Sequence, residues 1–418
     1  MPAGPYRDFT VWAFSTDNPR QADVHQATGL IQIVNLNIVL FDGVVADEDW
    51  PTMQHYAAQL SAYQVYEVIS GNLGIGLGRL TLDDSGRQRL ALIRGLRDAM
   101  SQALAPDNRQ PAVLLLSGPV RQAAQQASGF EQSLAGATHA TIAEEYAQWC
   151  RQAGRPAPAA RELEYGLWAA LIANVETCRG LLEGLDGTMT LPLLRQGLLD
   201  RYRAVDRTLW ATHLDRLELS VLGAHSILVS PSLAYAICIM YEVLLPLPTY
   251  PAVISDGSLG DALIEAALLI RLQNDIGPNL LRMPPAQRTA LLHTIAQRSA
   301  EAGCVTAEDV LELLRRLGRD DPSFTRLDKD LAKGETNVAL WHSRRARDAV
   351  SALGALSDSL AFFATLHDQH SARLTAALAA LDDRLGDQRA STIIRRFVQF
   401  HDRMYGLPHT EKTGEYAI

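Results

Sequence analysis

The pattern of apolar and polar positions along the chain predicts helices nearly throughout. Residues 20–70 predict two of them. The first is apolar almost all round until Asp42, which is typical of an enclosed helix, and the second begins at Trp50-Pro51. Residues 86–104 predict an amphipathic helix, and almost no stretch alternates with the period of two that a strand needs. We therefore expect an all-α fold.

Two apolar stretches allow other interpretations. Residues 111–120, PAVLLLSGPV, allow a short strand, although one such run does not make a sheet. Residues 219–241 form the longest uncharged run, and its length is enough to cross a bilayer. Because this run contains His225 and Pro231, two helices that meet at the proline inside a helical core explain it better. We therefore expect no membrane span.

Size and charge narrow the class of protein. The chain has 418 residues, a formal net charge of −9 and a pI near 5.7. This balance argues against nucleic acid as a partner, because phosphate binding favours a basic surface. The cysteines lie far apart without a CxxC pair and no signal peptide is evident, so we expect reduced thiols and a cytoplasmic location. The length allows one large helical domain or two ordinary ones, and we expect a single domain over 1–418.

The candidate chemistry begins in residues 262–282, which read ALIEAALLIRLQNDIGPNLLR. Apolar turns lead to Asn274-Asp275, just before Gly277-Pro278 breaks the helical pattern. A polar pair at such a place is costly inside a core unless something binds it. From this stretch alone two interpretations stay open, a helix that reaches the surface and a pair of ligands.

Further features follow in an order that a known family shares. Arg271 precedes Asn274-Asp275, and residues 329–337, KDLAKGETN, lie downstream. Together these stretches resemble two separated halves of the NDxxSxxxE motif of class I terpene synthases, the terpene cyclases of the isoprenoid synthase superfamily. This chain resembles a divergent bacterial member. An insertion at about residues 283–325 would separate the two halves.

Two more stretches are similar to motifs of this family. FDGVVADED, which contains Asp42 and Asp47, resembles the aspartate-rich motif. Near the C-terminus, Arg403 and Tyr405 resemble the Arg-Tyr pair that caps the active site of bacterial members. The resemblance therefore extends over the C-terminal part of the chain and, more loosely, over the helix that ends near Asp42.

The resemblance implies a helical bundle with a central active-site cavity, and Mg²⁺ as the cofactor. In this family a linear prenyl diphosphate ionises with the help of magnesium, the carbocation cyclises and diphosphate is released, which is a lyase reaction. Magnesium prefers carboxylate and amide oxygens, clustered positive charge stabilises the leaving group, and aromatic rings stabilise the carbocation. The metal ligands would be Asp42, Asp47, Asn274 and Asp330, the catalytic residues Asp42, Lys329, Arg403 and Tyr405, and the substrate-binding residues Arg271, Trp168, Trp210, Trp341 and Phe397.

Departures from the family pattern keep other functions open. Gly43 stands where the second aspartate often lies, and Ile239 or Met240 stands where a diphosphate-sensing arginine is expected. A second insertion is expected at about residues 71–130. The alternatives are a non-catalytic binding or scaffold protein with a degenerate metal site, and a prenyltransferase; a homodimer is also allowed. We expect Asp275 to be a structural partner of an arginine four residues before it.

Overall fold

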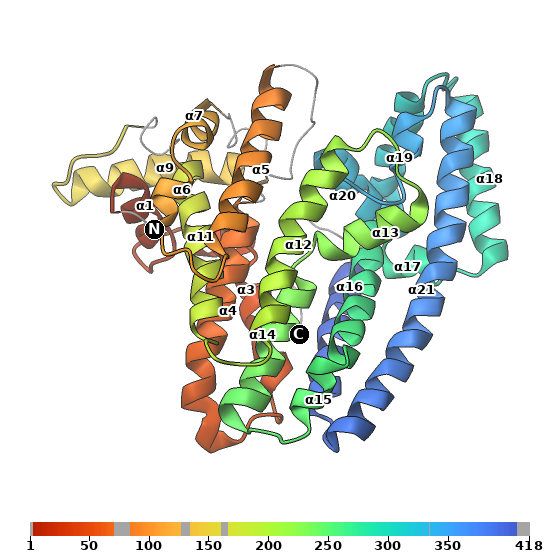
Figure 1. The fold of residues 1–418 in the computed structure, drawn as a ribbon. Helices are drawn as coiled ribbons and strands as arrows, with labels where there is room; N and C mark the ends of the chain where they lie inside the picture. Colours follow the sequence, from red (N-terminus) through yellow and green to blue (C-terminus); the bar gives the residue numbers. More distant parts are fainter. Residues whose placement is uncertain (1–2, 71–83, 127–133, 160–165, 334, 408–418) are drawn as a thin grey trace. The chain divides into compact units, whose positions relative to one another are not determined.

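Figure 1 shows the computed structural model of the chain, which describes residues 3–70, 84–126, 134–159, 166–333 and 335–407. All regular secondary structure in these described ranges is helical, and they contain no strand. The expectation of an all-α fold is therefore confirmed. Residues 71–83, which include the Gly-rich stretch, and residues 127–133 lie outside the described residues. The insertion expected at about 71–130 is therefore described only over 84–126.

The tertiary contacts divide the chain into two compact units. Unit 1 comprises Met1–Leu209 and Ala234–Pro246, and unit 2 comprises Trp210–Leu233 and Leu247–Ile418. The sequence does not predict this division, and a single domain over the whole chain stays a prediction. Each unit is described by itself below.

Unit 1 is built around two long helices that pack against each other, α4 and α11. Its core includes Leu60 and Tyr63 from α4 and Val175 and Cys178 from α11, all buried. The helices of this unit are α1 (Pro5–Ala13), α2 (Gln21–Ala27), α3 (Leu30–Phe41), η1 (Asp47–Asp49), α4 (Trp50–Ser70), α5 (Asp84–Ala103), α6 (Ala112–Leu115), α7 (Pro119–Gln126), α9 (Leu134–Gln152), α11 (Gly166–Glu183), α12 (Leu191–Trp210, its last residue in unit 2) and the π-helical segment η3 (Ile239–Leu244).

Helix α3 differs from the enclosed helix that its sequence predicts. It packs on α4 and α2, and it buries only Leu36, Asn37, Leu40 and Phe41. Ile38 on the same helix is 54% exposed. The expectation of an enclosed helix is therefore wrong, because partner helices cover only one face of an apolar cylinder.

The strand considered at 111–120 is also wrong. Pro111 precedes a single helical turn, α6, and a second helix, α7, begins at Pro119. The side chain of Glu176 accepts a hydrogen bond of 2.9 Å from the Ala112 amide, which satisfies a donor at the start of α6. A proline at the start of each helix fits these short elements better than a ladder of strand hydrogen bonds.

Unit 2 is organised around α16, which packs against α21, α13 and α22 (Figure 1). Most residues of α16 are buried, as an apolar central helix requires. The helices of this unit are α13 (Arg216–His225), α15 (Tyr250–Ser255), α16 (Ser258–Ile276), α17 (Pro278–Leu281), α18 (Pro285–Glu301), α19 (Ala307–Asp320), η4 (Pro322–Phe324), α20 (Thr325–Lys333), η5 (Ser343–Arg345), α21 (Ala349–Leu385) and α22 (Arg389–Gly406).

The end of α16 falls where the sequence predicts it. Gly277 follows the last helical residue with φ 90°, a left-handed value that side chains with a Cβ disfavour, and Pro278 then starts α17. The chain continues through α18 and α19, and Thr306 and Asp309 form a capping box at the start of α19. Helix α20 then packs against α16.

Two segments are apolar enough to be compared with membrane spans. The uncharged run of 219–241 is divided between α13, which ends at His225, and α14 (Val229–Cys238), so two helices are confirmed there. They do not meet at Pro231 as expected, because the break lies at 226–228 and Pro231 lies in the first turn of α14, where a proline is tolerated. Helix α21 is long and apolar enough to cross a bilayer by length and composition, with 44% of its most apolar window buried. A core helix of a soluble protein meets the same criteria, so this helix alone is weak evidence for a membrane span.

Candidate functional site: a buried ion network at the end of α16

The last turns of α16 carry an ion pair into the core of unit 2. Asp275 is fully buried, and its Oδ2 lies 2.8 Å from Nη2 of Arg271 and 3.0 Å from Nε of the same guanidinium. Arg271 also donates a hydrogen bond of 2.8 Å to the carbonyl of Thr336. The structural partnership expected for Asp275 and Arg271 is confirmed, and the predicted substrate-binding role of Arg271 stays a prediction.

Both oxygens of Asp275 have donors. The amide of Val338 donates to Oδ2 over 2.8 Å, and the side-chain amide of Asn274 donates to Oδ1 over 3.1 Å. Burial raises the pKa of Asp275 to about 6, and the like charge of Asp330 adds to this effect, whereas Arg271 opposes it. The aspartate is therefore held in place by its partners and not by solvent.

Helix α20 brings a second ion pair to the same place. Nζ of Lys329 lies 2.8 Å from Oδ1 of Asp330 and 3.1 Å from the carboxylate of Glu335. Burial by itself would raise the pKa of Asp330, but Lys329 and then Arg326 lower it to about 2. Burial would likewise lower the pKa of Lys329, but Asp330 and Glu335 raise it above its ordinary value. Both partners of this pair are thus charged.

Asn337 joins the two helices. Its side-chain amide nitrogen donates to the carbonyl of Asp275 over 2.6 Å and to Oδ2 of Asp330 over 2.7 Å. Its Oδ1 accepts from the amides of Ala339, over 2.9 Å, and Leu340, over 3.1 Å. The two sequence stretches that resemble separated halves of one motif therefore meet in space, with α18 and α19 between them along the chain.

Arg326 is the residue that the sequence analysis missed. Its Nε donates over 2.7 Å to the carbonyl of Asn274, 52 residues away along the chain, and its Nη2 donates to Oδ1 of the same asparagine. The guanidinium carbon lies 4.5 Å from the ring centroid of Tyr405, and burial raises the pKa of that phenol. Arg326 thus binds both oxygens of Asn274 and packs against the Arg-Tyr segment of α22.

Arg344 is the fourth cation of the network. Arg344 donates over 2.6 Å to the carbonyl of Glu335 and over 3.0 Å to the carbonyl of Asp330. Burial lowers the pKa of Arg344, while Asp330 and Asp275 oppose this effect. The term ion network is used below for Arg271, Asn274, Asp275, Arg326, Lys329, Asp330, Glu335, Asn337, Arg344 and Tyr405.

Cations or amide donors lie beside the oxygens of Asn274 and Asp330 that are predicted to bind magnesium, although Oδ1 of Asp330 accepts no hydrogen bond from the described residues. Oδ1 of Asn274 faces Arg326, whereas the two carboxylate oxygens of Asp330 face Lys329 and Asn337. A magnesium ion needs several oxygen ligands at short distance, and here it would share them with a guanidinium and an ammonium group. The residues as arranged therefore do not fit the ion. No group of three or more His, Cys, Asp or Glu side chains that could hold a metal was found in the described part of the chain.

The other predicted metal ligands belong to unit 1. Asp42 follows α3 directly and Asp47 begins η1, and both are exposed. Asn274 and Asp330 belong to unit 2. Because each group is described within its own unit, a metal centre shared by the two groups stays a prediction.

The predicted Arg-Tyr pair is divided. Tyr405 belongs to the ion network through its contact with Arg326, whereas Arg403 on the same helix is exposed. No ion pair or hydrogen bond links Arg403 to the described residues of the network. Residues two apart on a helix do not share a face, which explains why only one of the pair reaches the network.

The aromatic residues predicted to bind substrate differ in burial and in their contacts. Trp168 in unit 1 donates a hydrogen bond of 2.8 Å to the carbonyl of Leu116. In unit 2, Trp341 is 4% exposed with the guanidinium carbon of Arg345 3.4 Å from its ring centroid. Phe397, also in unit 2, is buried, whereas Trp210 is 46% exposed. Their predicted role in substrate binding stays a prediction.

The helix expected to carry a diphosphate-sensing arginine carries a carboxylate instead. In the π-helical segment η3, Glu242 accepts hydrogen bonds from the amides of Met189, over 2.6 Å, and Thr190, over 3.0 Å. These amides precede the first turn of α12, so the carboxylate satisfies donors at a helix start.

Comparisons of the chain with models of known families, with curated proteins and with solved structures found no match.

Proposed function

We propose that this chain is a class I terpene-synthase-like protein that binds an isoprenoid diphosphate without a magnesium ion at the end of α16. The resemblance of the two sequence stretches and the helical fold support the class of protein. The observation that carries the proposal is the guanidinium of Arg326, which occupies both oxygens of Asn274. The positive charge that a magnesium ion would supply in the family comes here from the side chains themselves.

Electrostatics favour this exchange of a metal for side chains. Arg271, Arg326, Lys329 and Arg344 place four cationic groups around the carboxylates of the ion network. A pair of unit charges 4 Å apart interacts by about 4 kcal/mol at an effective dielectric constant of 20. A divalent ion at these oxygens would have to displace cations that already neutralise the carboxylates of Asp275, Asp330 and Glu335.

A second candidate function is the magnesium-dependent reaction of the family. A linear prenyl diphosphate would be ionised, its carbocation cyclised and diphosphate released. The convergence of Asn274 and Asp275 with Lys329 and Asp330 favours this candidate, because Asn337 bridges the two helices as one unit. It requires Arg326 and Lys329 to leave the oxygens that they bind. Prenyl transfer remains a further prediction without an observation of its own.

Two measurements separate these candidates. In the first, the purified protein is incubated with magnesium and geranyl, farnesyl, geranylgeranyl or geranylfarnesyl diphosphate, and released diphosphate and volatile products are measured. We expect none above the background of a heat-denatured sample. Magnesium-dependent release that disappears in the Asp330→Ala variant would overturn the proposal in favour of the second candidate.

The second measurement tests binding directly. Farnesyl thiolodiphosphate, which resists ionisation, is titrated into the protein in the presence of a chelator and again with magnesium. We expect saturable binding with the chelator, and an affinity that magnesium leaves unchanged within twofold. Absence of binding in both buffers would show that the ion network has only a structural role.

A further inference from the structure

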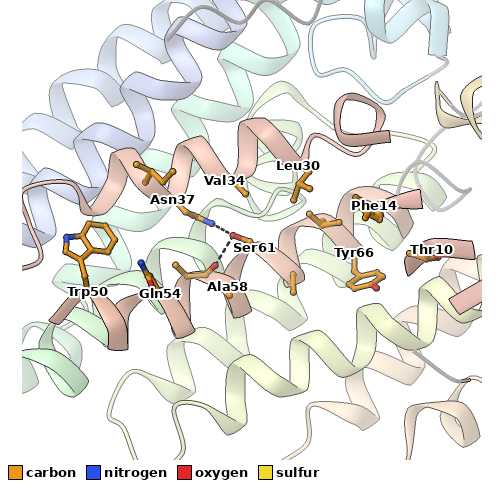
Figure 2. Close-up of a pocket in the computed structure, with 14 residues that line it drawn as sticks. Thr10, Phe14, Leu30, Val34, Asn37, Trp50, Gln54, Ala58, Ser61 and Tyr66 are labelled. Atoms are coloured by element: carbon orange, nitrogen blue, oxygen red, sulfur yellow. Dashed lines mark hydrogen bonds between the residues drawn. The ribbon is translucent and has the colours of Figure 1, made fainter. Parts of the chain in front are cut away.

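Two cavities of unit 1 differ in character. The groove between α3 and α4 has a mostly apolar wall, in which the side-chain amide of Asn37 donates over 2.8 Å to Oγ of Ser61 (Figure 2). A second cavity, of about 450 Å³, lies where the end of α5, residues 104–111, the C-terminal half of α11 and the start of α12 meet. Sites for small ligands span about 300–1,000 Å³. We call it the charged cavity, because its wall includes Arg109, Glu176, Arg179, Glu183, Asp186 and Arg195.

The arginines of this wall have few partners in the chain. Arg109 and Arg195 make no ion pair or hydrogen bond with the described residues. Nε of Arg195 is buried, but its terminal nitrogens Nη1 and Nη2 are not, so a ligand in the cavity can reach them. Because a guanidinium group carries five N–H donors, both arginines keep donors for an anionic group.

Arg179 is the most enclosed of the three arginines, with 11% of its side chain exposed. Its Nε donates over 3.1 Å to the carbonyl of Ala103. The carboxylate of Glu176 lies 3.6 Å from Nη1, which is too far for a hydrogen bond, and accepts a hydrogen bond from the Ala112 amide instead. The positive charge of this wall is therefore only weakly compensated by Glu176.

Two carboxylates of the same wall are unpaired as well. Glu183 is the last residue of α11, Asp186 follows three residues later, and both are exposed. Neither side chain forms an ion pair or hydrogen bond in the described part of the chain, although both share the cavity with Arg109 and Arg195. Charges of both signs thus line one cavity without neutralising each other.

This arrangement selects a ligand that carries both charges. A simple anion would be attracted by the arginines but repelled by Glu183 and Asp186, and a simple cation would meet the opposite problem. The three arginines balance the three carboxylates, so a ligand without net charge leaves the cavity neutral. A guanidinium group binds a carboxylate, and a carboxylate binds an ammonium group, through charge-assisted hydrogen bonds.

We propose that the charged cavity binds a small zwitterion of the amino-acid or short-peptide kind. Arg109 and Arg195 hold its carboxylate, and Glu183 and Asp186 hold its ammonium group. The site stands on residues of unit 1 alone, so it does not depend on the proposed function of the ion network.

Three peptides that differ in their end groups test this assignment. Triglycine, N-acetyl-triglycine without the ammonium group and triglycinamide without the carboxylate are titrated into the full-length protein at pH 7, and ligand-observed NMR gives the dissociation constants. Because each charge-assisted contact contributes a factor of about ten or more, triglycine should bind at least about tenfold more tightly than either blocked peptide. Absence of triglycine binding would overturn the proposal. Equal binding of N-acetyl-triglycine would also overturn it, in favour of a site for anions alone.

Two substitutions locate the ends of the ligand. Arg195→Gln should reduce the preference for triglycine over triglycinamide by about threefold or more, and Glu183→Gln should reduce the preference over N-acetyl-triglycine to a similar extent. Arg203→Gln on α12 and Glu144→Gln on α9 change exposed charges outside the wall and should leave all three affinities unchanged. Thermal melting checks that each variant folds. Preferences that persist in both cavity variants, or that fall equally in the controls, would overturn the assignment.

Discussion

The ion network of unit 2 contains Asn274, which is half-buried, and helix α3 of unit 1 contains Asn37, which is buried; the surroundings of their side-chain oxygens differ in one respect. The side-chain oxygen of Asn274 is held by Arg326, whereas the side-chain oxygen of Asn37 has no donor among the described residues. In the ion network a cation lies beside this oxygen of Asn274, and Lys329 also lies 2.8 Å from Oδ1 of Asp330, whereas no cation or donor is found at Oδ1 of Asn37 among the described residues. The comparison shows that the polar residues that stand out in the sequence can be those whose atoms already have partners in the folded chain.

The largest expected effect concerns the satisfied site. Replacing Arg271 with methionine leaves the carboxylate of Asp275 buried without its ion-pair partner, so Arg271→Met should lower the free energy of unfolding by about 3–5 kcal/mol. Chemical denaturation measures this change. As a control, Arg203 is 53% exposed and pairs with Asp200 at 3.4 Å, so Arg203→Met should cost about 0–1 kcal/mol. Equal costs for the two variants would show that the network is not a structural unit.

A smaller effect is expected from the pH dependence of stability. His401 packs beside Tyr405, and burial lowers its pKa to about 4. An unfolded chain has a histidine pKa near 6.5, so between about pH 6.5 and 4 the unfolded state binds a proton that the folded state does not. The contribution of the neutral ring is complete above pH 6.5 and is lost as the pH falls toward 4.

Denaturation at pH 7 and at pH 4.5 tests this expectation. The unmodified protein should lose roughly 2 kcal/mol more than His401→Phe over this interval, after allowance for partial exposure of the ring. His293→Gln changes an exposed histidine on α18 and should retain the full pH dependence. An unchanged pH dependence in His401→Phe would mean that water reaches this side of the ion network.

The smallest effect concerns the unsatisfied site. Asn37→Leu removes the hydrogen bond to Ser61 but also removes the buried oxygen that lacks a donor. These contributions oppose each other, so the free energy of unfolding of the ligand-free protein should change by about 1 kcal/mol or less. A loss comparable to that of Arg271→Met would show that Asn37 is a structural residue and would remove the contrast between the two sites.

Part of this arrangement is predictable from the sequence, because local rules decide it. The spacing of four residues between Arg271 and Asp275 places them on one helix face, and Gly277 ends the helix as expected. The resemblance of residues 271–275 and 329–337 to two halves of one motif also predicts that the two stretches meet. The helical class follows from the near absence of alternating patterns.

The rest depends on packing that a single sequence does not determine. Arg326 reaches Asn274 only because α20 packs against α16 after α18 and α19, and nothing near Arg326 in the sequence indicates that partner. The exposed face of α3 also follows from how the helices pack and cannot be read from the sequence. An apolar helix is covered only where other helices reach it, so its pattern predicted burial on all sides while the structure leaves Ile38 exposed.

The most direct test of the central claim is a calorimetric titration of magnesium into the unmodified protein and into Arg326→Met, with pyrophosphate present in both samples. If Arg326 occupies the place of the ion, the unmodified protein should give no saturable heat of magnesium binding. Arg326→Met frees the oxygens of Asn274 and should give saturable heat that the added substitution Asp330→Ala abolishes. Saturable, magnesium-dependent heat in the unmodified protein that is lost in Asp330→Ala would contradict the account.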